Sequence, residues 1–396
     1  MLVKQYKDML GAKSVIREIS EYGGRRAKEI GYENVFDYSL GNPSVPTPAA
    51  FNDELIRLVK EEGMTGLHGY SPSLGIDYVR EAIADSLNRR FGMAYTKDHI
   101  FPTSGCAAAL THAFHLVTVP GDTVLTFAPY FPEYHPYVDL TGARLKVVPP
   151  DVKNFQVDFE KFEEALTPDV MALLVNTPNN PSGTVLTPET LTTMADILKR
   201  KEKEFGHDIY LISDEPYREI VFAGVDAPYV AKYYDKTITC YSFSKSVSLP
   251  GERIGYVAIA PECPEAETMI QMCGQISRGV GHNCPSSLIQ RAVVSVLDMT
   301  SDLSVYEKNM NILYKELTGL GFSIVKPSGT FYMFPQALEE DAKVFAQKAL
   351  KYDLLLVPGD TFECPGYFRI AYCIDTEKVE RSLDAFRRFV KTEYRM

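Results

Sequence analysis

The stretch Tyr241-Ser-Phe-Ser-Lys-Ser-Val-Ser-Leu-Pro-Gly-Glu-Arg-Ile-Gly-Tyr256 sets one lysine, Lys245, among serines and eight residues ahead of Arg253. A β-branched run (237–239) precedes it and an apolar run (256–260) follows it. Burying an ammonium group costs either its hydration or its charge, so a lysine between two predicted core strands needs a chemical reason. A Schiff base with a carbonyl cofactor is one such reason, with hydroxyls and a guanidinium beside it to hold a phosphate.

Around this stretch, helix-like and strand-like segments alternate from about residue 75 to 260, which predicts an α/β fold with a mostly parallel sheet covered by helices. A chain of 396 residues exceeds the usual size of a single core, so two domains are expected. We predict a large domain over 46–285, and a smaller α+β domain built from 1–45 and 286–396.

The predicted elements are as follows. Helices are expected at 15–30, 76–91, 106–118, 188–204, 286–320, 342–352 and 376–391. Strands are expected at 123–127, 144–148, 171–176, 209–213, 237–241, 256–260, 322–325, 330–334, 354–357 and 367–371.

Composition excludes several classes of protein. The net charge is −11 and no basic tract is long enough to follow a nucleic-acid backbone. No apolar run approaches the roughly 20 residues of a membrane span, and the first residues lack the apolar core of a signal peptide. The seven cysteines are odd in number and form no Cys-x-x-Cys pair, which favours reduced thiols in a cytoplasm. We therefore expect a cytoplasmic protein with neither nucleic-acid nor membrane partners.

Two loops offer groups for an anion and a ring, and the second of them follows the predicted strand 171–176. Thr103-Ser-Gly-Cys-Ala-Ala-Ala109 is a glycine turn opening a helix, and its free N–H groups suit a phosphate. Asn176-Thr-Pro-Asn-Asn-Pro-Ser-Gly183 is rigid and polar, and Asn180 could donate to a ring oxygen. The structural alternatives are an ordinary helix-opening glycine and simple turn chemistry.

Two further loops carry charge. In Ser213-Asp-Glu-Pro-Tyr217, Asp214 could pair with a ring N–H and Tyr217 with a phenolic oxygen; a helix cap or turn is the alternative for Asp214. In the opening stretch, Lys245 would serve as Schiff-base lysine and general acid/base, with a solvated surface lysine as the alternative. The phosphate ligands expected there are Ser242, Ser244 and Arg253.

Phe131, after the predicted strand 123–127, could stack on a planar ring. Arg369 lies inside an apolar strand and would suit a substrate carboxylate, or else a structural ion pair. His112 and His115 have helical spacing but lack partners for a metal site, so no metal is expected.

These motifs together give a family resemblance. The chain resembles the class I/II aminotransferases of the fold-type-I pyridoxal-phosphate (PLP) enzymes, aspartate aminotransferases among them, from Ser39-Leu-Gly-Asn-Pro43 to Arg369. The pattern S-x-S-K-x(7)-R-x-G over 242–255 is the most specific part, and Tyr70-Ser-Pro-Ser-Leu-Gly-Ile76 before a helix agrees with it.

The resemblance implies a large domain with a mostly parallel seven-stranded sheet, a smaller domain, and a homodimer. It implies that Lys245 carries the internal aldimine, that Asp214 pairs the pyridine nitrogen, and that Asn180 and Tyr217 bond the ring's 3-oxygen. Arg369, with backbone near Gly41, would bind the α-carboxylate. Tyr70 would reach the phosphate of the neighbouring subunit's cofactor. The remaining phosphate ligands implied are the backbone groups of Gly105, Cys106 and Ala107 and the side chains of Ser242 and Arg253.

Three positions depart from the family's pattern. Phe131 stands where many members have tryptophan, which keeps the stacking but loses the indole donor. Cys106 and Ala107 replace larger polar residues. One bacterial branch of aspartate aminotransferases has a lysine after the loop glycine to bind the substrate's side-chain carboxylate, and this chain lacks it.

The expected activity is ping-pong transfer of an amino group from an L-amino acid, with aspartate as a candidate, to a 2-oxo acid such as 2-oxoglutarate. Arg278, five residues before Asn283, resembles an arginine that crosses the dimer interface to bind a distal carboxylate; a surface arginine is the alternative. An aromatic or alanine aminotransferase and a PLP-dependent carbon–sulfur β-lyase remain alternatives. An amino-acid- or PLP-sensing regulator is disfavoured by the absence of a basic DNA-binding domain, and an NTPase by the absence of G-x-x-x-x-G-K-[ST].

Overall fold

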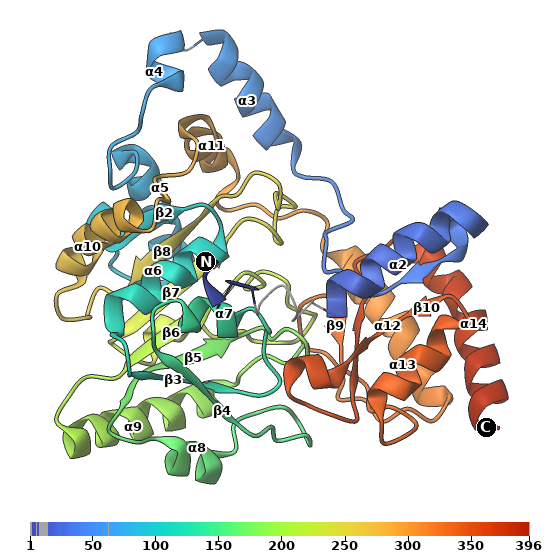
Figure 1. Ribbon diagram of the computed structural model, residues 1–396. Helices are drawn as coiled ribbons and strands as arrows, with labels where there is room; N and C mark the ends of the chain where they lie inside the picture. Colours follow the sequence, from blue (N-terminus) through green and yellow to red (C-terminus); the bar gives the residue numbers. More distant parts are fainter. Residues whose placement is uncertain (1, 5, 8–14, 62, 396) are drawn as a thin grey trace. The chain divides into compact units, whose positions relative to one another are not determined.

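The computed structural model describes residues 2–4, 6–7, 15–61 and 63–395. Its contacts divide the chain into two compact units, shown in Figure 1. The larger unit comprises residues 45–179 and 184–303, and the smaller comprises 1–44, 180–183 and 304–396. The loop at 176–183 is therefore shared, because its last four residues belong to the smaller unit.

The larger unit is built on a seven-stranded sheet with the order β2-β8-β7-β6-β5-β3-β4. Strand β8 pairs antiparallel with both β7 and β2, and the other pairs are parallel. The mostly parallel sheet expected from the sequence is thus confirmed. Its strands are β2 (Ile100–Thr103), β3 (Thr123–Phe127), β4 (Arg144–Val148), β5 (Val170–Asn176), β6 (Tyr210–Asp214), β7 (Thr237–Ser242) and β8 (Gly255–Ile259).

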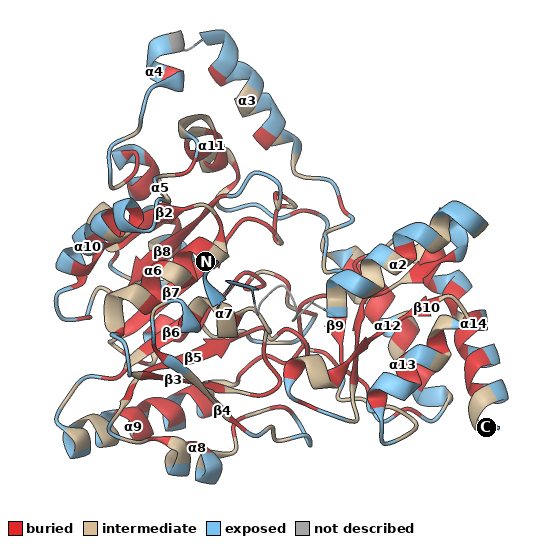
Figure 2. Cartoon of the chain, viewed as in Figure 1, coloured by how far each residue is buried: buried red, intermediate tan, exposed pale blue. Residues whose placement is uncertain are grey.

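Two apolar cores cover the two faces of this sheet, and β5 shows how. Ala172 and Leu174 belong to one core, whereas Leu173 and Val175 belong to the other. Successive strand side chains point to opposite faces, so a strand buried on both sides becomes a continuous apolar run. Figure 2 shows the sheet buried between helices.

Helices of the larger unit fall into two groups by the core they join. Those of the first core are α3 (Ala49–Glu61), α5 (Asp77–Phe91), α6 (Cys106–Val117), α10 (Ala266–Gly279) and α11 (Ser287–Ala292). Those of the second are α8 (Phe159–Ala165) and α9 (Pro188–Phe205). Shorter pieces are α4 (Met64–His68), α7 (Tyr134–Asp139), and the 3-10 turns η2 (Lys97–His99), η3 (Val230–Lys232) and η4 (Val293–Val296).

The smaller unit is an α+β arrangement. It contains a parallel pair, β1 with β10, and a three-stranded antiparallel sheet in the order β11-β12-β9. Its strands are β1 (Phe36–Asp37), β9 (Tyr332–Met333), β10 (Leu354–Leu355), β11 (Val357–Pro358) and β12 (Phe368–Ala371). Its helical elements are α2 (Val15–Ile30), α12 (Ser304–Gly319), α13 (Ala342–Leu350), α14 (Thr376–Tyr394), and the 3-10 turns η1 (Tyr32–Asn34) and η5 (Gly359–Phe362).

Two predicted elements of the C-terminal part were wrong. The stretch 322–325 forms no strand; its apolar character reflects the burial of Phe322, whose ring packs 6.0 Å from that of Phe345. The predicted long helix at 286–320 is interrupted between η4 and α12, where the Ser301 N–H donates to the Ser246 carbonyl at 2.8 Å. Residues 286–303, expected with the smaller domain, group with the larger unit, where α11 packs on α3.

Strand β2 and helices α3 and α10 were not predicted from the sequence. Each is short or bears a mixed pattern: β2 is four residues long and includes Pro102. None of the helices in the described part of the chain combines the length and apolar character that a membrane crossing needs.

Candidate active site

Three neighbouring strands of the larger sheet end at the same edge and carry polar side chains there. Asn176, the last residue of β5, lies beside Asp214, the last residue of β6, and Asp214 lies beside Cys240 of β7. The Asn176 amide donates to the Asp214 carbonyl at 2.8 Å. Ligands of open α/β sheets bind beyond the carboxyl ends of the strands, so this edge is the candidate active site.

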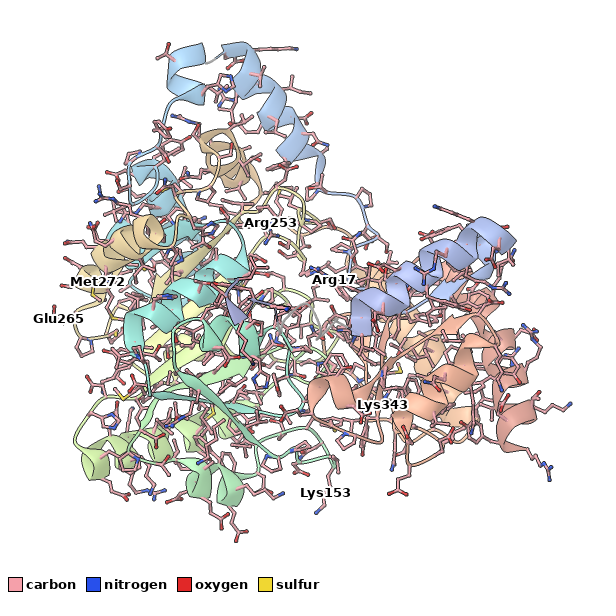
Figure 3. All side chains as sticks on the ribbon, viewed as in Figure 1. Arg17, Lys153, Arg253, Glu265, Met272 and Lys343 are labelled. Atoms are coloured by element: carbon pink, nitrogen blue, oxygen red, sulfur yellow. The ribbon has the colours of Figure 1, made fainter. Side chains whose placement is uncertain are left out.

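A glycine turn and a guanidinium form an anion seat at this edge. Gly105 adopts φ +87°, and a Cβ there would meet Arg253 Nη2 at 2.7 Å. Arg253, labelled in Figure 3, donates to the carbonyls of Pro250 at 2.9 Å and Ser104 at 3.3 Å. Helix α6 begins at Cys106 without a side-chain cap. Free N–H groups, the helix dipole and a guanidinium therefore share one place, which suits a phosphate.

Steric crowding explains why a glycine, Gly255, ends the S-x-S-K-x(7)-R-x-G pattern. A Cβ at this position would collide with the Tyr241 carbonyl and would lie 3.1 Å from the Cα of Gly105. Because β8 passes this close to the turn at Gly105, only glycine leaves room for the anion seat.

Asp214 is buried and its carboxylate has two neutral donors. The Cys106 thiol donates to Oδ1 at 2.9 Å, and the Tyr134 hydroxyl donates to Oδ2 at 2.5 Å. Burial raises the pKa of Asp214 to about 6, while both hydrogen bonds act to lower it. A cation beside this carboxylate would repay the desolvation of its charged form.

Lys245 lies in the turn after β7, three residues beyond Ser242. It is partly exposed, whereas Ser242 and Ser244 are buried. The turn is anchored next to the lysine, because the Ser246 hydroxyl shares a hydrogen bond with the Tyr241 hydroxyl at 2.8 Å. The lysine is thus presented by a fixed turn and is less deeply buried than the flanking strands suggest.

The aromatic residues expected at this edge follow β3 and β6. Phe131 lies just before α7 and packs edge-on against Tyr134, with 5.7 Å between ring centroids. Tyr217 is buried in the turn after β6. Ala107 is partly exposed in the first turn of α6. The set of an amine, a buried carboxylate, an anion seat and an aromatic ring fits a phosphorylated pyridine aldehyde.

The smaller unit holds a second candidate anion site around Arg369 of β12. Its side chain is 2% exposed, and it donates to Asn180 Oδ1 at 3.0 Å and to the Ser39 carbonyl at 2.5 Å. The guanidinium also lies over the rings of Tyr332 (4.7 Å) and Phe362 (5.0 Å). Both of these acceptors are neutral oxygens, and a guanidinium can bind a carboxylate through two parallel hydrogen bonds.

Gly41 belongs to this second site. A Cβ at Gly41 would collide with the hydroxyl of Tyr332, the residue whose ring underlies Arg369. The backbone at Gly41 therefore lies directly against Tyr332.

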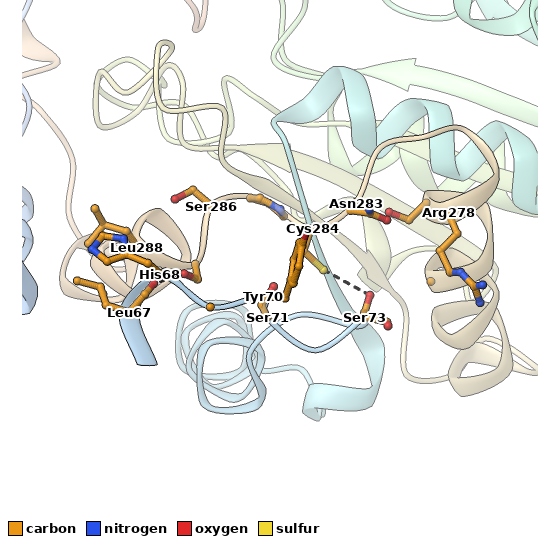
Figure 4. Close-up of a pocket in the computed structure, with 15 residues that line it drawn as sticks. Leu67, His68, Tyr70, Ser71, Ser73, Arg278, Asn283, Cys284, Ser286 and Leu288 are labelled. Atoms are coloured by element: carbon orange, nitrogen blue, oxygen red, sulfur yellow. Dashed lines mark hydrogen bonds between the residues drawn. The ribbon is translucent and has the colours of Figure 1, made fainter. Parts of the chain in front are cut away.

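Tyr70 and Arg278 line one pocket of the larger unit. Its volume is about 740 Å³, and Asn283 and Cys284 also line it, as Figure 4 shows. The Tyr70 side chain is completely exposed, and Arg278 Nη1 is 3.3 Å from Gln275 Oε1. The structure thus places together the two residues that the sequence assigned to a neighbouring subunit's site.

Two site residues escaped the sequence reasoning. The sequence analysis assigns no role to Tyr134, and it places Tyr332 only within the predicted strand 330–334. Each could have been suspected, because Tyr134 is three residues after Phe131, and Tyr332 follows Gly329-Thr-Phe at the start of β9. His112 is buried and bonds the Ala108 carbonyl of its own helix at 2.7 Å.

Comparison with known proteins assigns the chain to a family. The model of the family "Aminotransferase class I and II" matches residues 33–386. Aromatic-amino-acid aminotransferase 2 of Thermococcus litoralis is 32% identical over 91% of this chain and 93% of its own length. Aspartate aminotransferase of Thermotoga maritima is 29% identical over 91% and 92%.

Solved structures agree. An amino transferase from Eubacterium rectale is 43% identical, covers 100% of both chains and has a TM-score of 0.96. Aspartate aminotransferase from Thermus thermophilus with maleate is 26% identical, covers 95% and 97%, and has a TM-score of 0.84. The relatives are named as aminotransferases, which disfavours the β-lyase alternative. The chain therefore belongs to the class I and II aminotransferases of fold type I, and it is a PLP-dependent aminotransferase.

Proposed function

We propose that this aminotransferase binds PLP at the strand-end site of the larger unit and transfers the amino group of an L-amino acid to 2-oxoglutarate or a similar 2-oxo acid. One observation carries this proposal. Cys106 directly follows Gly105 of the anion seat, and its thiol donates to the buried Asp214 carboxylate. The proposed phosphate seat and the proposed partner for a ring nitrogen are thus joined by a hydrogen bond, although 108 positions separate Cys106 from Asp214 along the chain.

When bound, PLP supplies an aldehyde that reacts with amines and a ring that withdraws electrons from the substrate Cα. Lys245 would hold the cofactor and move the proton between the substrate Cα and the cofactor C4′. Asp214 would keep the ring nitrogen protonated, because an ionised buried carboxylate gains from a neighbouring cation. Phe131 would stack on the ring.

The phosphate would be bound at the anion seat, and the other ring substituents by nearby polar groups. The 3-oxygen would be bonded by Asn180 and Tyr217. The proposed phosphate ligands are the backbone of Gly105, Cys106 and Ala107 and the side chains of Ser242, Ser244 and Arg253.

For the substrate, we propose that Arg369 binds the α-carboxylate with backbone near Gly41. Its fixed, planar fork matches a carboxylate in two parallel hydrogen bonds. Asn180 orients the fork through Nη1.

Aspartate is the proposed amino donor, with an aromatic amino acid as the alternative. Relatives are named for each substrate, and the Thermus thermophilus structure carries maleate, a dicarboxylate. A second carboxylate needs a second cation, and we assign that part to Arg278 of a neighbouring subunit.

We propose a cytoplasmic homodimer. Tyr70 of one subunit would reach the phosphate of its partner's cofactor, which agrees with its complete exposure in the single chain. All seven cysteines are free thiols in the structure, in keeping with a reducing compartment. Sedimentation of the purified protein tests the dimer, and a monomer at assay concentrations would contradict it.

The decisive experiment is spectroscopic. The purified protein with added PLP should absorb visible light, and borohydride should abolish that absorbance and fix a pyridoxyl group on the tryptic peptide of Lys245. The Lys245→Ala variant should bind PLP, but borohydride should not attach a pyridoxyl group to it. A protein that stays colourless and takes up no PLP would overturn the proposal. Screening amino acids against 2-oxoglutarate then identifies the donor.

A further inference from the structure

A thiol–carboxylate pair in the active site points to a role for Cys106 beyond its backbone. The Cys106 Sγ lies 2.9 Å from Asp214 Oδ1, and these residues are 108 positions apart along the chain. The thiol therefore reaches Asp214 by virtue of the fold, because α6 begins beside the end of β6.

The two groups affect each other's protonation. Burial raises the pKa of the Asp214 carboxyl to about 6, and the hydrogen bond from the thiol opposes this rise. In turn, burial and the adjacent carboxylate raise the pKa of the Cys106 thiol well above its usual value. A cysteine at a helix N-terminus ordinarily has a lowered pKa, so here burial and the adjacent carboxylate together outweigh the helix dipole. The thiol keeps its proton and remains a donor at neutral pH.

The hydrogen bond from Cys106 also helps to orient the Asp214 carboxylate. The carboxylate accepts from Cys106 at Oδ1 and from Tyr134 at Oδ2, so one donor on each oxygen fixes its plane. Loss of either donor would leave a buried carboxylate oxygen less satisfied, which costs more than the mean value of a hydrogen bond.

We propose that Cys106 is a positioning residue that acts through Asp214: its thiol proton holds the carboxylate ionised and correctly turned toward the ring nitrogen of the cofactor. This inference rests on the proposed function, because it assigns Asp214 to that nitrogen. It predicts two linked properties, an unreactive Cys106 and a PLP affinity that depends on a donor at position 106.

The first test needs no cofactor. In the PLP-free protein, iodoacetamide labelling of Cys106, followed by mass spectrometry across pH 6 to 9, should be slow. Asp214→Asn removes the negative charge, so labelling of Cys106 should accelerate at least fivefold near pH 8 and its pH profile should move down. Cys284 is a matched control, because it is also partly exposed but bonds the Pro72 and Ser73 carbonyls, and its rate should not change. An unchanged Cys106 rate in Asp214→Asn would overturn the inference.

The second test compares two substitutions by PLP titration. Cys106→Ala removes the donor and should weaken PLP binding roughly fivefold, the fold-change that corresponds to about one hydrogen bond. Cys106→Ser keeps a donor and should restore most of that loss. Equal melting temperatures of the two PLP-free variants would show that both fold.

The possible failures are distinguishable. If the unmodified protein binds no PLP, the proposed function fails. If it binds PLP and Cys106→Ala binds it equally well, the positioning role fails while the proposed function stands. If Ser and Ala weaken binding alike, side-chain volume rather than the donor matters, and the inference is overturned.

Discussion

Arg369 Nη1 lies 3.0 Å from Asn180 Oδ1, although 189 residues separate the two along the chain. The same guanidinium donates to the Ser39 carbonyl and lies within 5.0 Å of the ring centroids of Tyr332 and Phe362. Residues from distant parts of the chain thus position one buried cation. The first two predictions follow from this arrangement.

Arg369→Lys should lower kcat/KM roughly 100-fold, which corresponds to about 3 kcal/mol. An ammonium cannot reproduce a two-point contact with a carboxylate, and the substitution removes the hydrogen bond from Nη1 to Asn180 Oδ1. Steady-state kinetics with the best amino donor measures it. Arg387→Lys is the matched control, since Arg387 pairs with Glu316 on the surface of α14. A variant with unaltered kcat/KM would contradict the carboxylate role.

Gly41→Ala should destabilise the protein by about 1–3 kcal/mol through overpacking and should raise KM, because the new methyl group would collide with the Tyr332 hydroxyl. Chemical unfolding and kinetics measure the two effects. Gly24→Ala is the control: no atom lies within 4 Å of a Cβ there, and it lies within helix α2, so it should be neutral or slightly stabilising. Equal behaviour of the two variants would contradict the contact.

Gly105→Ala should weaken PLP binding and should cost about 1–3 kcal/mol of stability, because alanine disfavours φ +87°. The methyl group would also displace Arg253 Nη2, 2.7 Å away. Gly121→Ala separates the two causes, since Gly121 has φ +101° but nothing within 4 Å of its Cβ. Both variants should lose stability, and only Gly105→Ala should lose PLP affinity in a titration. A matching loss in Gly121→Ala would assign the effect to general destabilisation.

Features whose residues lie close together along the chain could be predicted from the sequence, whereas contacts between distant residues could not. Lys245, Arg253 and Gly255 lie within one short motif, so their pattern carried the prediction. Asp214 ends a recognisable buried strand. Contacts made across the fold left no such mark: Tyr134 meets Asp214 over 80 positions and Cys106 meets it over 108. No periodic pattern in the sequence indicates a contact between residues so far apart along the chain.

The same distinction applies to the fold. Strands β3 and β4 were predicted to the residue, because each is a compact β-branched or apolar run between turns. The stretch 322–325 has a similar composition, yet its Phe322 is buried against Phe345 and Phe368 outside any strand. An apolar run indicates that its side chains are buried. Tertiary packing then decides whether the backbone pairs with another strand.

The stability of the PLP-free protein should depend on pH through Asp214. Its folded pKa of about 6 is above the ordinary value of 3.8, so the folded state binds the proton more tightly. The resulting stabilisation is full below pH 4 and is lost as the pH rises through 6. The difference corresponds to about 3 kcal/mol.

Urea unfolding at several pH values between 4.5 and 7.5 measures this dependence as the difference between the unmodified protein and Asp214→Asn. In Asp214→Asn, the part of the pH-dependent loss of stability that comes from Asp214 should be absent. Burial raises the pKa of Glu215 to about 7, and the loss of stability that comes from Glu215 should remain in both proteins. Parallel curves for the two proteins would show that Asp214 titrates normally in the fold.

Substrate choice should depend on Arg278. Arg278 and Tyr70 line the same pocket. We therefore expect that both side chains contribute to the active site of a neighbouring subunit. If Arg278 binds a distal carboxylate, Arg278→Ala should lower kcat/KM for aspartate roughly 10- to 100-fold, the value of a hydrogen-bonded charge, and should leave alanine and aromatic donors nearly unchanged. Arg388→Ala, on the surface of α14, controls for the loss of one positive charge. An equal loss for aspartate and for an aromatic donor would place Arg278 outside the specificity site and favour the aromatic alternative.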